Sequence, residues 1–306
     1  MTNQDARQCP TGARALLDHQ LADSIEPRYL ESGAYQLEAL HELYNENAKY
    51  FRGSMTGLGR NIFRFMNDPQ AIKQSLSGYK NYDAFPAFGL PANDVDSSAA
   101  LRTMRTRRSC RSFGAPLALL ELGTLLRAAI SSSGRATPKN APLEQLFLRP
   151  YASAGSMAPV EFYCGLLNVR DTPRMLGHYD PRSHQLRVIK NDLSLAAFKA
   201  FQTHEDGLLE SASAIIFITG VFHRSIAKYG QRGYKFTLME AGAAYQTLQL
   251  AATGLGLGSI VWSSFFDDEV EALLGIDGAS ESIVTCVLVG NPMSSGAADE
   301  QGDNGK

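Results

Sequence analysis

The sequence predicts an α+β protein, and three observations support this class. Segments with strand character alternate with segments of helical periodicity, but their spacing is too uneven for a parallel, doubly wound sheet. Of the 306 residues, 44% are hydrophobic and 20% are charged, which is usual for a globular protein. The sequence shows no internal repeat, and its length fits two domains or one large domain.

The N-terminal region, residues 1–95, is predicted to consist of helices and loops. Residues 35–44 carry apolar side chains at helical spacing, whereas Pro86 and Pro91 exclude a regular helix around them. The region ends in an extended linker. Its aromatic residues predict that it packs on the main domain: Tyr44, Tyr50, Phe51, Phe63 and Phe65.

The main domain, residues 96–293, carries stronger signals. A helix is predicted over 117–130, where leucines form one stripe before Ser131–Gly134 ends it. The other predicted elements are strands over 160–169, 212–222 and 282–289, a hairpin around the turn 181–184, and a helix over 234–253 that Gly254 stops. Residues 294–306 lack large apolar side chains and are predicted to be a disordered tail.

Charge and cysteine usage exclude several classes of protein. The formal net charge of −2 disfavours a nucleic-acid partner, which usually requires a basic domain. No apolar run reaches about 18 residues, and the N-terminus has no signal-peptide pattern, so we expect a cytoplasmic protein without a membrane partner. The four cysteines form no CxxC pair, which predicts reduced thiols and no metal site. His178 and His184 flank the hairpin turn and are predicted to be surface residues.

The segment from Arg107 to Phe113 is the first candidate binding site. It places the guanidiniums of Arg107, Arg108 and Arg111 and the hydroxyls of Ser109 and Ser112 around one turn just before a helix. Arginine offers charged, bidentate donors, so this pattern suits a phosphate. A solvated basic turn is the alternative interpretation.

Three further stretches carry candidate site residues. Small residues at Ser153, Ala154 and Gly155 allow a backbone to approach a flat ligand, although they also suit a tight loop before a strand. Residues 222–234 combine basic and aromatic side chains. The last stretch runs from Glu240-Ala-Gly242 to Gly254–Ser259. Its glycine-rich turn after a helix is also typical of a C-cap, and it misses the GxGxxG dinucleotide pattern.

Taken in order, these stretches and Gly290-Asn-Pro292 resemble the FMN-dependent nitroreductase superfamily. Within it, the chain is similar to the SagB-type dehydrogenases, the azoline oxidases of thiazole/oxazole-modified peptide biosynthesis. The cues for this subgroup are residues 43–49, 79–82 with Leu90-Pro91, 177–186 and 222–234. The resemblance covers residues 41 to 292. It implies a nitroreductase-like fold with a mixed central sheet flanked by helices, in an intertwined homodimer.

The resemblance also implies roles for individual residues. Arg107, Arg108, Ser109 and Arg111 would hold the phosphate and ribityl chain of FMN. Ser153, Ala154 and Gly155 would line the isoalloxazine ring, and Leu257 and Gly258 would close its other side. Lys228 and Tyr229 match a Lys-Tyr pair that serves in proton removal.

The implied activity is the oxidation of peptide thiazolines or oxazolines to thiazoles or oxazoles. A base removes the ring α-proton, hydride passes to flavin N5, and O₂ reoxidises the flavin. Family members are homodimers with FMN between the subunits, and they work beside a cyclodehydratase. The chain departs from the pattern at Ala152, at Ala243 and after Pro292, where no basic residue follows.

A positively charged helix face would favour the neutral form of Lys228, which can act as a base. If residues 224–232 are helical, Arg224 and Arg232 lie four residues on either side of Lys228. Two other functions stay open. One is a general NAD(P)H-dependent nitro- or quinone reductase, against which Lys228-Tyr229 and the N-terminal region argue. The other is a non-catalytic subunit that docks a biosynthetic partner through residues 1–95.

Overall fold

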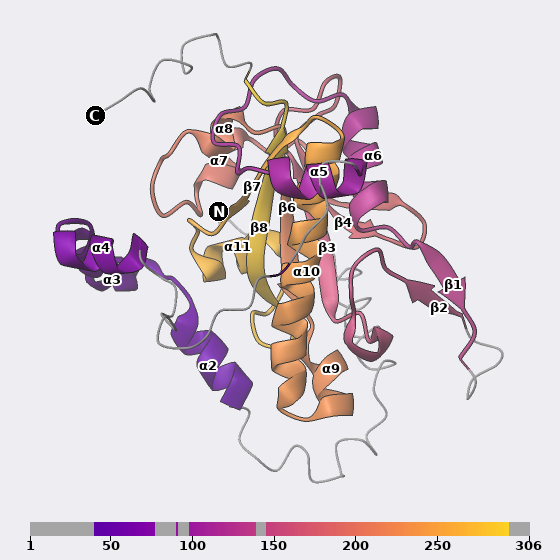
Figure 1. Cartoon of the computed structure of the whole chain (residues 1–306), viewed down its shortest axis with the longest axis horizontal. Coiled ribbons are helices and arrows are strands. Elements are labelled where there is room, and N and C mark those ends of the chain that lie inside the picture. Colours follow the sequence, from indigo (N-terminus) through magenta and orange to yellow (C-terminus); the bar gives the residue numbers. More distant parts are fainter. Residues whose placement is uncertain (1–39, 77–89, 91–97, 139–144, 294–306) are drawn as a thin grey trace, which may run out of the picture.

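The structure is a computed structural model, and it describes residues 40–76, 90, 98–138 and 145–293 (Figure 1). The expected linker, the expected tail, the cue at 79–82 and Cys9 lie outside the described residues. The division into residues 1–95, 96–293 and 294–306 therefore stays a prediction.

A six-stranded sheet forms the centre of the molecule, with the strand order β5-β4-β3-β6-β8-β7. The strands are β3 (Val160–Leu166), β4 (Met175–Asp180), β5 (Gln185–Lys190), β6 (Ala214–Gly220), β7 (Gly258–Trp262) and β8 (Ser282–Gly290). All neighbouring strands pair antiparallel. Among the described residues, a parallel contact occurs in the isolated bridge between Leu117 and Val169, so the expected mixed character is confined to that bridge.

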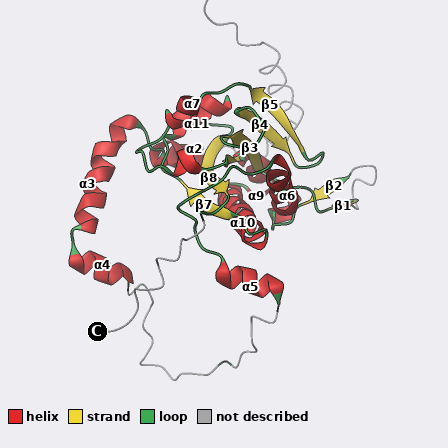
Figure 2. Ribbon diagram, turned by 90° about the horizontal axis from the view of Figure 1, so that it is seen from above, coloured by secondary structure: helices red, strands yellow, loops and turns green. Residues whose placement is uncertain are grey.

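Helices cover both faces of this sheet (Figure 2). On one face lie α5 (Ala99–Thr106), α6 (Leu119–Ala129), α9 (Phe222–Tyr229) and the long α10 (Arg232–Gly254). On the other lie α7 (Leu195–Lys199), α8 (Leu208–Ser211) and α11 (Asp267–Leu274). Side chains alternate along each strand, so Ile216 of β6 joins the α10 side of the core and Phe217 joins the opposite side.

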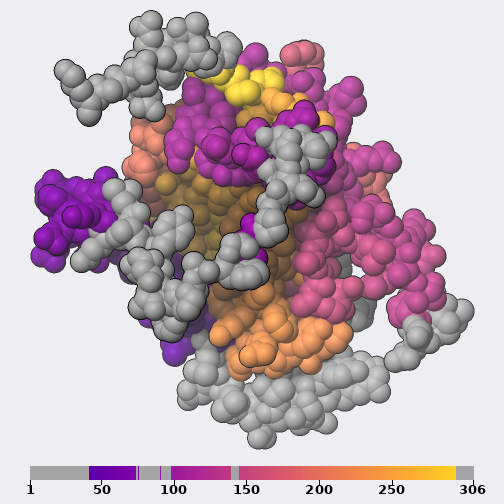
Figure 3. All heavy atoms as spheres, viewed as in Figure 1, coloured from indigo at the N-terminus to yellow at the C-terminus, as the bar shows by residue number. Residues whose placement is uncertain are grey.

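The N-terminal helices are α2 (Leu40–Ala48), α3 (Met55–Met66) and α4 (Pro69–Leu76), with the short η2 (Arg52–Ser54) between α2 and α3. Helix α2 packs on the body, where His41 contacts the rings of Phe222 and Tyr234. Helix α3 buries no residue, and Figure 3 shows α3 and α4 standing out from the body. Phe63 and Phe65 are exposed, so the expected packing of these two aromatics on the main domain is wrong.

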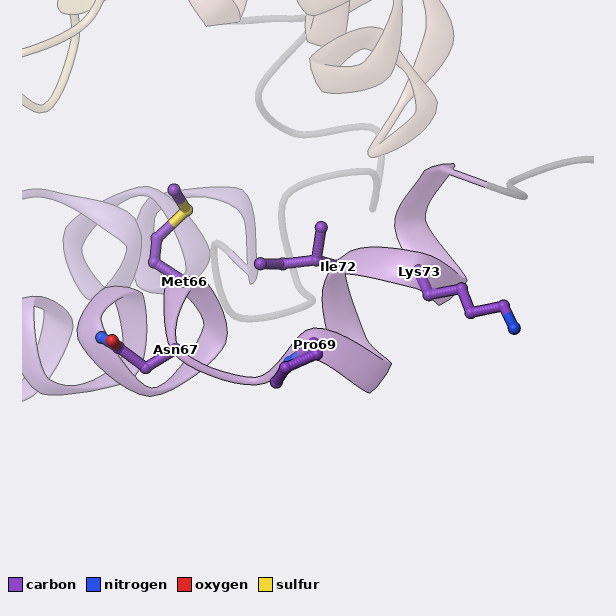
Figure 4. Close-up of a pocket in the computed structure, with 5 residues that line it drawn as sticks. All are labelled: Met66, Asn67, Pro69, Ile72 and Lys73. Carbon is purple, nitrogen blue, oxygen red and sulfur yellow. The ribbon is translucent and has the colours of Figure 1, made fainter. Parts of the chain in front are cut away.

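A shallow hollow lies between α3 and α4 (Figure 4). Met66 and Ile72 lie on opposite sides of it, and Asn67, Pro69 and Lys73 complete the lining. Of its lining residues, none belongs to the sets predicted to bind FMN.

Most predicted elements of the main domain are confirmed. They include the strands β3, β6 and β8, the hairpin of β4 and β5, and the helices α6 and α10. The end of α10 differs from expectation: Gly254 is still helical, and Gly256 has the left-handed conformation, with φ of 73°. The sequence interpretation missed β7, α11 and the small β1 (Gly134–Ala136) and β2 (Leu146–Leu148) pair.

Candidate functional site

The segment from Arg107 to Phe113 lies between α5 and α6 and has no regular secondary structure. The predicted helix follows it as α6, but the predicted turn is absent from these described residues. The amide of Cys110 donates to the carbonyl of Ser259 at 2.9 Å, and Phe113 bridges to Pro292. The segment therefore lies across the end of the sheet where β7 begins and β8 ends.

Two paired glycines make room for this segment. Gly258 lies opposite Gly290 in the β7–β8 register. A Cβ on Gly258 would lie 2.6 Å from Cys110 Sγ, and one on Gly290 would lie 2.9 Å from the ring of Phe113. Close approach of the arginine segment thus requires glycine at both positions. Leu257 is buried, and its amide donates to the carbonyl of Ala252 at the end of α10.

The cations of the segment differ in their availability. Among the described residues, no carboxylate pairs with Arg107, which is half-buried, or with Arg111, which is exposed. The guanidinium of Arg108 instead donates to the carbonyls of Arg105 and Arg107, at 2.7 and 2.9 Å. Ser109 is half-buried. Arg107 and Arg111 can therefore receive an anion, and Arg108 can do so with the guanidinium nitrogens other than Nη1, which bonds the backbone.

The predicted ring-binding loop contains the short η4 (Ala154–Ser156). Gly155 and Ser156 both have φ of 56°, and the amide of Ala158 donates to Ser153 Oγ at 3.1 Å. This left-handed backbone explains the small residues of the loop.

Lys228 and Tyr229 end α9 and lie directly against this loop. A Cβ on Gly155 would overlap Tyr229 Oη and lie 2.6 Å from Lys228 Nζ. Lys228 Nζ is 5.3 Å from the centroid of the Tyr229 ring, and that ring meets Phe236 edge-on at 5.0 Å. The fold therefore brings together two predicted motifs that are 73 residues apart in the sequence.

The expected charged face around Lys228 is wrong. Gly230, with φ of 58°, ends α9, and Arg232 begins α10. Arg224 shares α9 with Lys228, but its guanidinium bonds to Glu161 at 2.5 Å and to the carbonyl of Ala158 at 3.0 Å. The two arginines thus do not flank Lys228 on one helix.

Glu161 forms the centre of a half-buried polar group next to the loop, with Arg224 and His178 as its partners. Burial alone would raise the pKa of Glu161, but hydrogen bonds and charges from His178 and Arg224 lower it to about 2. His178 Nε2 lies 2.9 Å from Glu161, and the side chain of His178 is 32% exposed, so His178 lies partly at the surface. Burial would lower the pKa of His178, but its bond to Glu161 raises it above the usual value. His184 bonds Tyr179 at 2.6 Å.

Glu240 of α10 is a candidate site residue to which the sequence assigned no role beyond its place in the motif Glu240-Ala-Gly242. Its side chain is 3% exposed, and neither carboxylate oxygen completes a hydrogen bond. Burial raises the pKa of Glu240 to about 7, although the nearby Ser153 hydroxyl, Arg149 and the Ala154 amide act to lower it. The motif Glu240-Ala-Gly242 was its only signal in the sequence.

The site residues thus form two groups at opposite ends of α10 (Figure 1). The arginine segment, Leu257 and Gly258 lie at its C-terminal end, and the 153–155 loop with Lys228 and Tyr229 lies towards its N-terminal end. From Glu240 to Gly254 the helix rises about 21 Å. The predicted FMN contacts therefore fall into two separate groups along α10.

Cysteines and metal-binding patterns add no further site. Cys164 and Cys286 are buried, and burial raises the pKa of Cys164 to about 12. Within the described ranges, no cluster of His, Cys, Asp and Glu could hold a metal ion. A search of the same residues found no helix long and apolar enough to cross a membrane.

Comparisons with known proteins place this arrangement in a class. The nitroreductase family profile matches residues 104–291. The chain is 30% identical over 189 residues to the nitroreductase-named MJ1384 of Methanocaldococcus jannaschii, which covers 60% of this chain and 87% of that protein. It is 27% identical over 133 residues to the microcin B17-processing protein McbC of Escherichia coli, over 42% of this chain and 49% of McbC.

Two solved structures share the fold. A nitroreductase structure from Anabaena variabilis matches with a TM-score of 0.52 and 28% identity, over 63% of this chain and 38% of that chain. A chain of the E. coli microcin synthetase McbBCD complex, with truncated pro-MccB17 bound, matches with a TM-score of 0.55 and 20% identity, over 84% of this chain and 98% of that chain. The chain thus spans less than half of McbC and of the Anabaena protein.

The fold and the matched residues define an α+β protein of the flavin oxidoreductase class. The chain belongs to the nitroreductase family.

Proposed function

We propose that the protein is an FMN-dependent oxidase that converts thiazolines or oxazolines of a peptide to thiazoles or oxazoles. The observation that carries this proposal is the contact of Lys228 and Tyr229 with Gly155. It places a candidate base and a phenol beside the loop that resembles a flavin-binding loop. Similarity to the microcin-processing protein McbC supports the same substrate class.

The residues present fit FMN in two respects. Arg107 and Arg111 have no carboxylate partner among the described residues and can take a terminal phosphate. The 153–155 loop, in which Gly155 has a left-handed backbone, has no large side chain that would keep a flat ring away. In this proposal Arg107, Arg108, Ser109 and Arg111 hold the phosphate and ribityl chain, Ser153, Ala154 and Gly155 line the ring, and Leu257 and Gly258 close its other side.

The reaction removes two hydrogens from each azoline ring. Bound FMN supplies the acceptor for the hydride, and O₂ accepts the two electrons afterwards. The side chains of the protein would accept the α-proton of the ring. Lys228 Nζ and Tyr229 Oη are the candidate proton acceptors, because both reach the loop and neither has a carboxylate partner among the described residues.

A homodimer follows from the separation of the two groups along α10. A two-fold related copy can place the arginine segment of one subunit beside the 153–155 loop of the other. We further propose that a cyclodehydratase supplies the azoline peptide, in the cytoplasm. The match to a chain of the McbBCD complex supports a multi-protein setting.

Turnover of a thiazoline peptide tests the proposal. The purified protein should remove two hydrogens per ring in air, as measured by mass spectrometry. Lys228→Ala and Tyr229→Phe should each reduce the rate by about 10²–10⁴-fold, the usual range for a positioned acid or base. Both variants should keep their FMN.

The exposed Lys235→Ala is the matched control and should turn over like the wild type. Rapid bleaching of the flavin by NADPH, with no thiazole formed, would instead indicate a general reductase. A protein that stays colourless after incubation with FMN would indicate a docking subunit.

A further inference from the structure

Glu240 is the most buried acidic group near the 153–155 loop, and it lacks the partners that such a group normally has. Buried carboxylates are almost always hydrogen-bonded. Both oxygens of Glu240 are enclosed without a completed hydrogen bond, although the Ser153 hydroxyl and the Ala154 amide lie close. A small movement of the loop towards α10 would complete both bonds.

The neighbours of Glu240 share this property. Arg149 Nε and Nη1 and the hydroxyl of Tyr151 are also buried without a partner. The positive charge of Arg149 acts to lower the pKa of both Glu240 and Tyr151. Donors from the 149–151 segment and an acceptor from α10 thus face one another with their bonds unmade. These side chains can therefore exist in two arrangements, one with their hydrogen bonds open and one with them formed.

The 153–155 loop joins this group to the Lys-Tyr pair. Ala154 faces Glu240, and the next residue, Gly155, touches Tyr229 Oη and Lys228 Nζ. There is no room for a side chain at that contact. A shift of Ala154 therefore also moves Gly155, against which Tyr229 Oη and Lys228 Nζ lie.

We propose that Glu240 is a positioning residue, whose carboxylate holds the 153–155 loop through the Ser153 hydroxyl and the Ala154 amide and so sets the places of Lys228 and Tyr229. The proposal deepens the proposed function and rests on it for the role of the pair. The physical coupling from Glu240 to Lys228 can be measured without any substrate.

The charge of Glu240 controls its hydrogen bonds with the Ser153 hydroxyl and the Ala154 amide. The ionised form accepts from both donors, whereas the neutral form has fewer acceptor sites and one O–H donor. Burial raises the pKa of Glu240 to about 7, so the hold changes around neutral pH. The other charged groups that face it are Arg149 and Arg224. Behind Arg224 lie Glu161 and His178.

Of these neighbours, His178 is the other group whose protonation must be controlled. Its bond to Glu161 raises the pKa of His178 above the usual histidine value, whereas Glu161 stays ionised with a pKa of about 2. A test must therefore separate Glu240 from His178.

Competitive acetylation of the flavin-loaded protein provides that test. Acetic anhydride labels neutral amines, and mass spectrometry compares Lys228 with the exposed Lys235 from pH 5.5 to 8.5. In the wild type, the ratio of the two labels should change with a midpoint near pH 7, by about threefold or more. Glu240→Gln should abolish this midpoint, Glu240→Asp should retain it, and His178→Asn should leave it in place.

The same midpoint in Glu240→Gln, or its loss in His178→Asn alone, would overturn the proposal. A flat ratio in the wild type would overturn it as well. If the Gln variant does not bind FMN, Ser153→Ala removes one of the two donors, and it should lower the amplitude of the change. An unchanged amplitude in Ser153→Ala would contradict the proposal.

Turnover separates this inference from the proposed function. If azolines are oxidised, Glu240→Gln should lower kcat by between about tenfold and a hundredfold, the scale of a small misplacement, without weakening FMN binding. If azolines are not oxidised but the acetylation midpoint depends on Glu240, the positioning role stands and the substrate assignment fails.

Discussion

Gly155 is the contact point of two polar side chains, and this makes it the most restrictive residue of the candidate site. Its φ of 56° already disfavours other residues, and a Cβ would overlap Tyr229 Oη. The overlapping atoms are the ends of flexible side chains. The fold can therefore survive a substitution that displaces the pair.

The first prediction concerns Gly155→Ala. We expect it to lower azoline oxidation by about 10²-fold while FMN content stays unchanged, because the pair moves away from the loop. Gly207→Ala is the matched control, since Gly207 has φ of 73° but open space around its Cβ position. Both variants share the strain of a left-handed backbone, so equal activity losses would show that only strain matters.

The second prediction concerns the stability of the protein against pH. Burial raises the pKa of Glu240 from 4.5 to about 7, so between these values the folded state keeps a proton that the unfolded chain has lost. The free energy of unfolding therefore falls as pH rises through this window. Above pH 7, where Glu240 is ionised in the folded state as well, the whole destabilisation is present.

The glutamine side chain in Glu240→Gln does not ionise, so this variant should not be destabilised as pH rises. Between pH 5 and pH 8, its free energy of unfolding should rise relative to the wild type by roughly 2–3 kcal/mol. Denaturant titrations at the two pH values measure this difference. Parallel pH dependences for the two proteins would contradict a buried, titrating Glu240.

Individual residues show where sequence reasoning stops. The chemical character of the arginine segment and of the Lys-Tyr pair could be predicted from their residue types. The partner of Arg224 was not, because Glu161 is 63 residues away and only the pairing of β3 with β6 brings it near. The burial of Glu240 under Ser153 is likewise a tertiary contact without a local pattern.

Elements with a clear apolar pattern were predicted well, and those defined by glycine were not. The buried β6 and β8 and the long α10 follow directly from continuous apolar runs. The break between α9 and α10 depends on Gly230, with its positive φ, and on Gly233, where a Cβ would lie 2.5 Å from the amide of Ile226. Two glycines three residues apart were the available signal for that break.

A buried lysine directly after helix α2 helps to anchor this helix to the body. Lys49 Nζ lies 2.9 Å from Glu271 of α11 and 2.7 Å from Glu46, and the side chains of Lys49 and Glu271 are 7% and 5% exposed. Burial would lower the pKa of Lys49, but the bonds to both carboxylates raise it well above its usual value. Lys49 ends the 43–49 stretch that resembles the SagB-type subgroup, so part of this stretch serves to hold α2 in place.

The third prediction is that Lys49→Met lowers the free energy of unfolding by about 3–5 kcal/mol, because it leaves Glu271 buried without its cation. Adding Glu271→Gln should recover part of the loss. Chemical denaturation measures both variants, with the exposed Lys235→Met as the control. A change within about 1 kcal/mol for Lys49→Met would mean that the pair behaves like an exposed ion pair.

At the scale of the whole molecule, the proposed homodimer would bring the two groups of site residues together from two subunits. The fourth prediction uses mixed dimers in which one subunit carries Arg111→Ala and the other Lys228→Ala. If each site takes its arginine segment from one subunit and its Lys-Tyr pair from the other, one of the two sites is intact. Differently tagged subunits allow this mixed dimer to be purified.

The mixed dimer should recover about half of the wild-type activity per dimer, whereas each parent variant should have almost none. If both groups acted within one subunit, every site in the mixed dimer would carry one defect. No recovery of activity would therefore place the whole site in a single chain. Light scattering at twice the subunit mass of 33.3 kDa verifies the dimer.

An anaerobic absorbance spectrum shows whether azolines reduce a flavin bound to this chain. We expect a yellow protein whose flavin absorbance is bleached when a thiazoline peptide is added without O₂, and recovers when air is admitted. The corresponding thiazole peptide should cause no bleaching. A yellow protein that NADPH bleaches but the thiazoline peptide does not would contradict the account, and so would a protein without flavin absorbance.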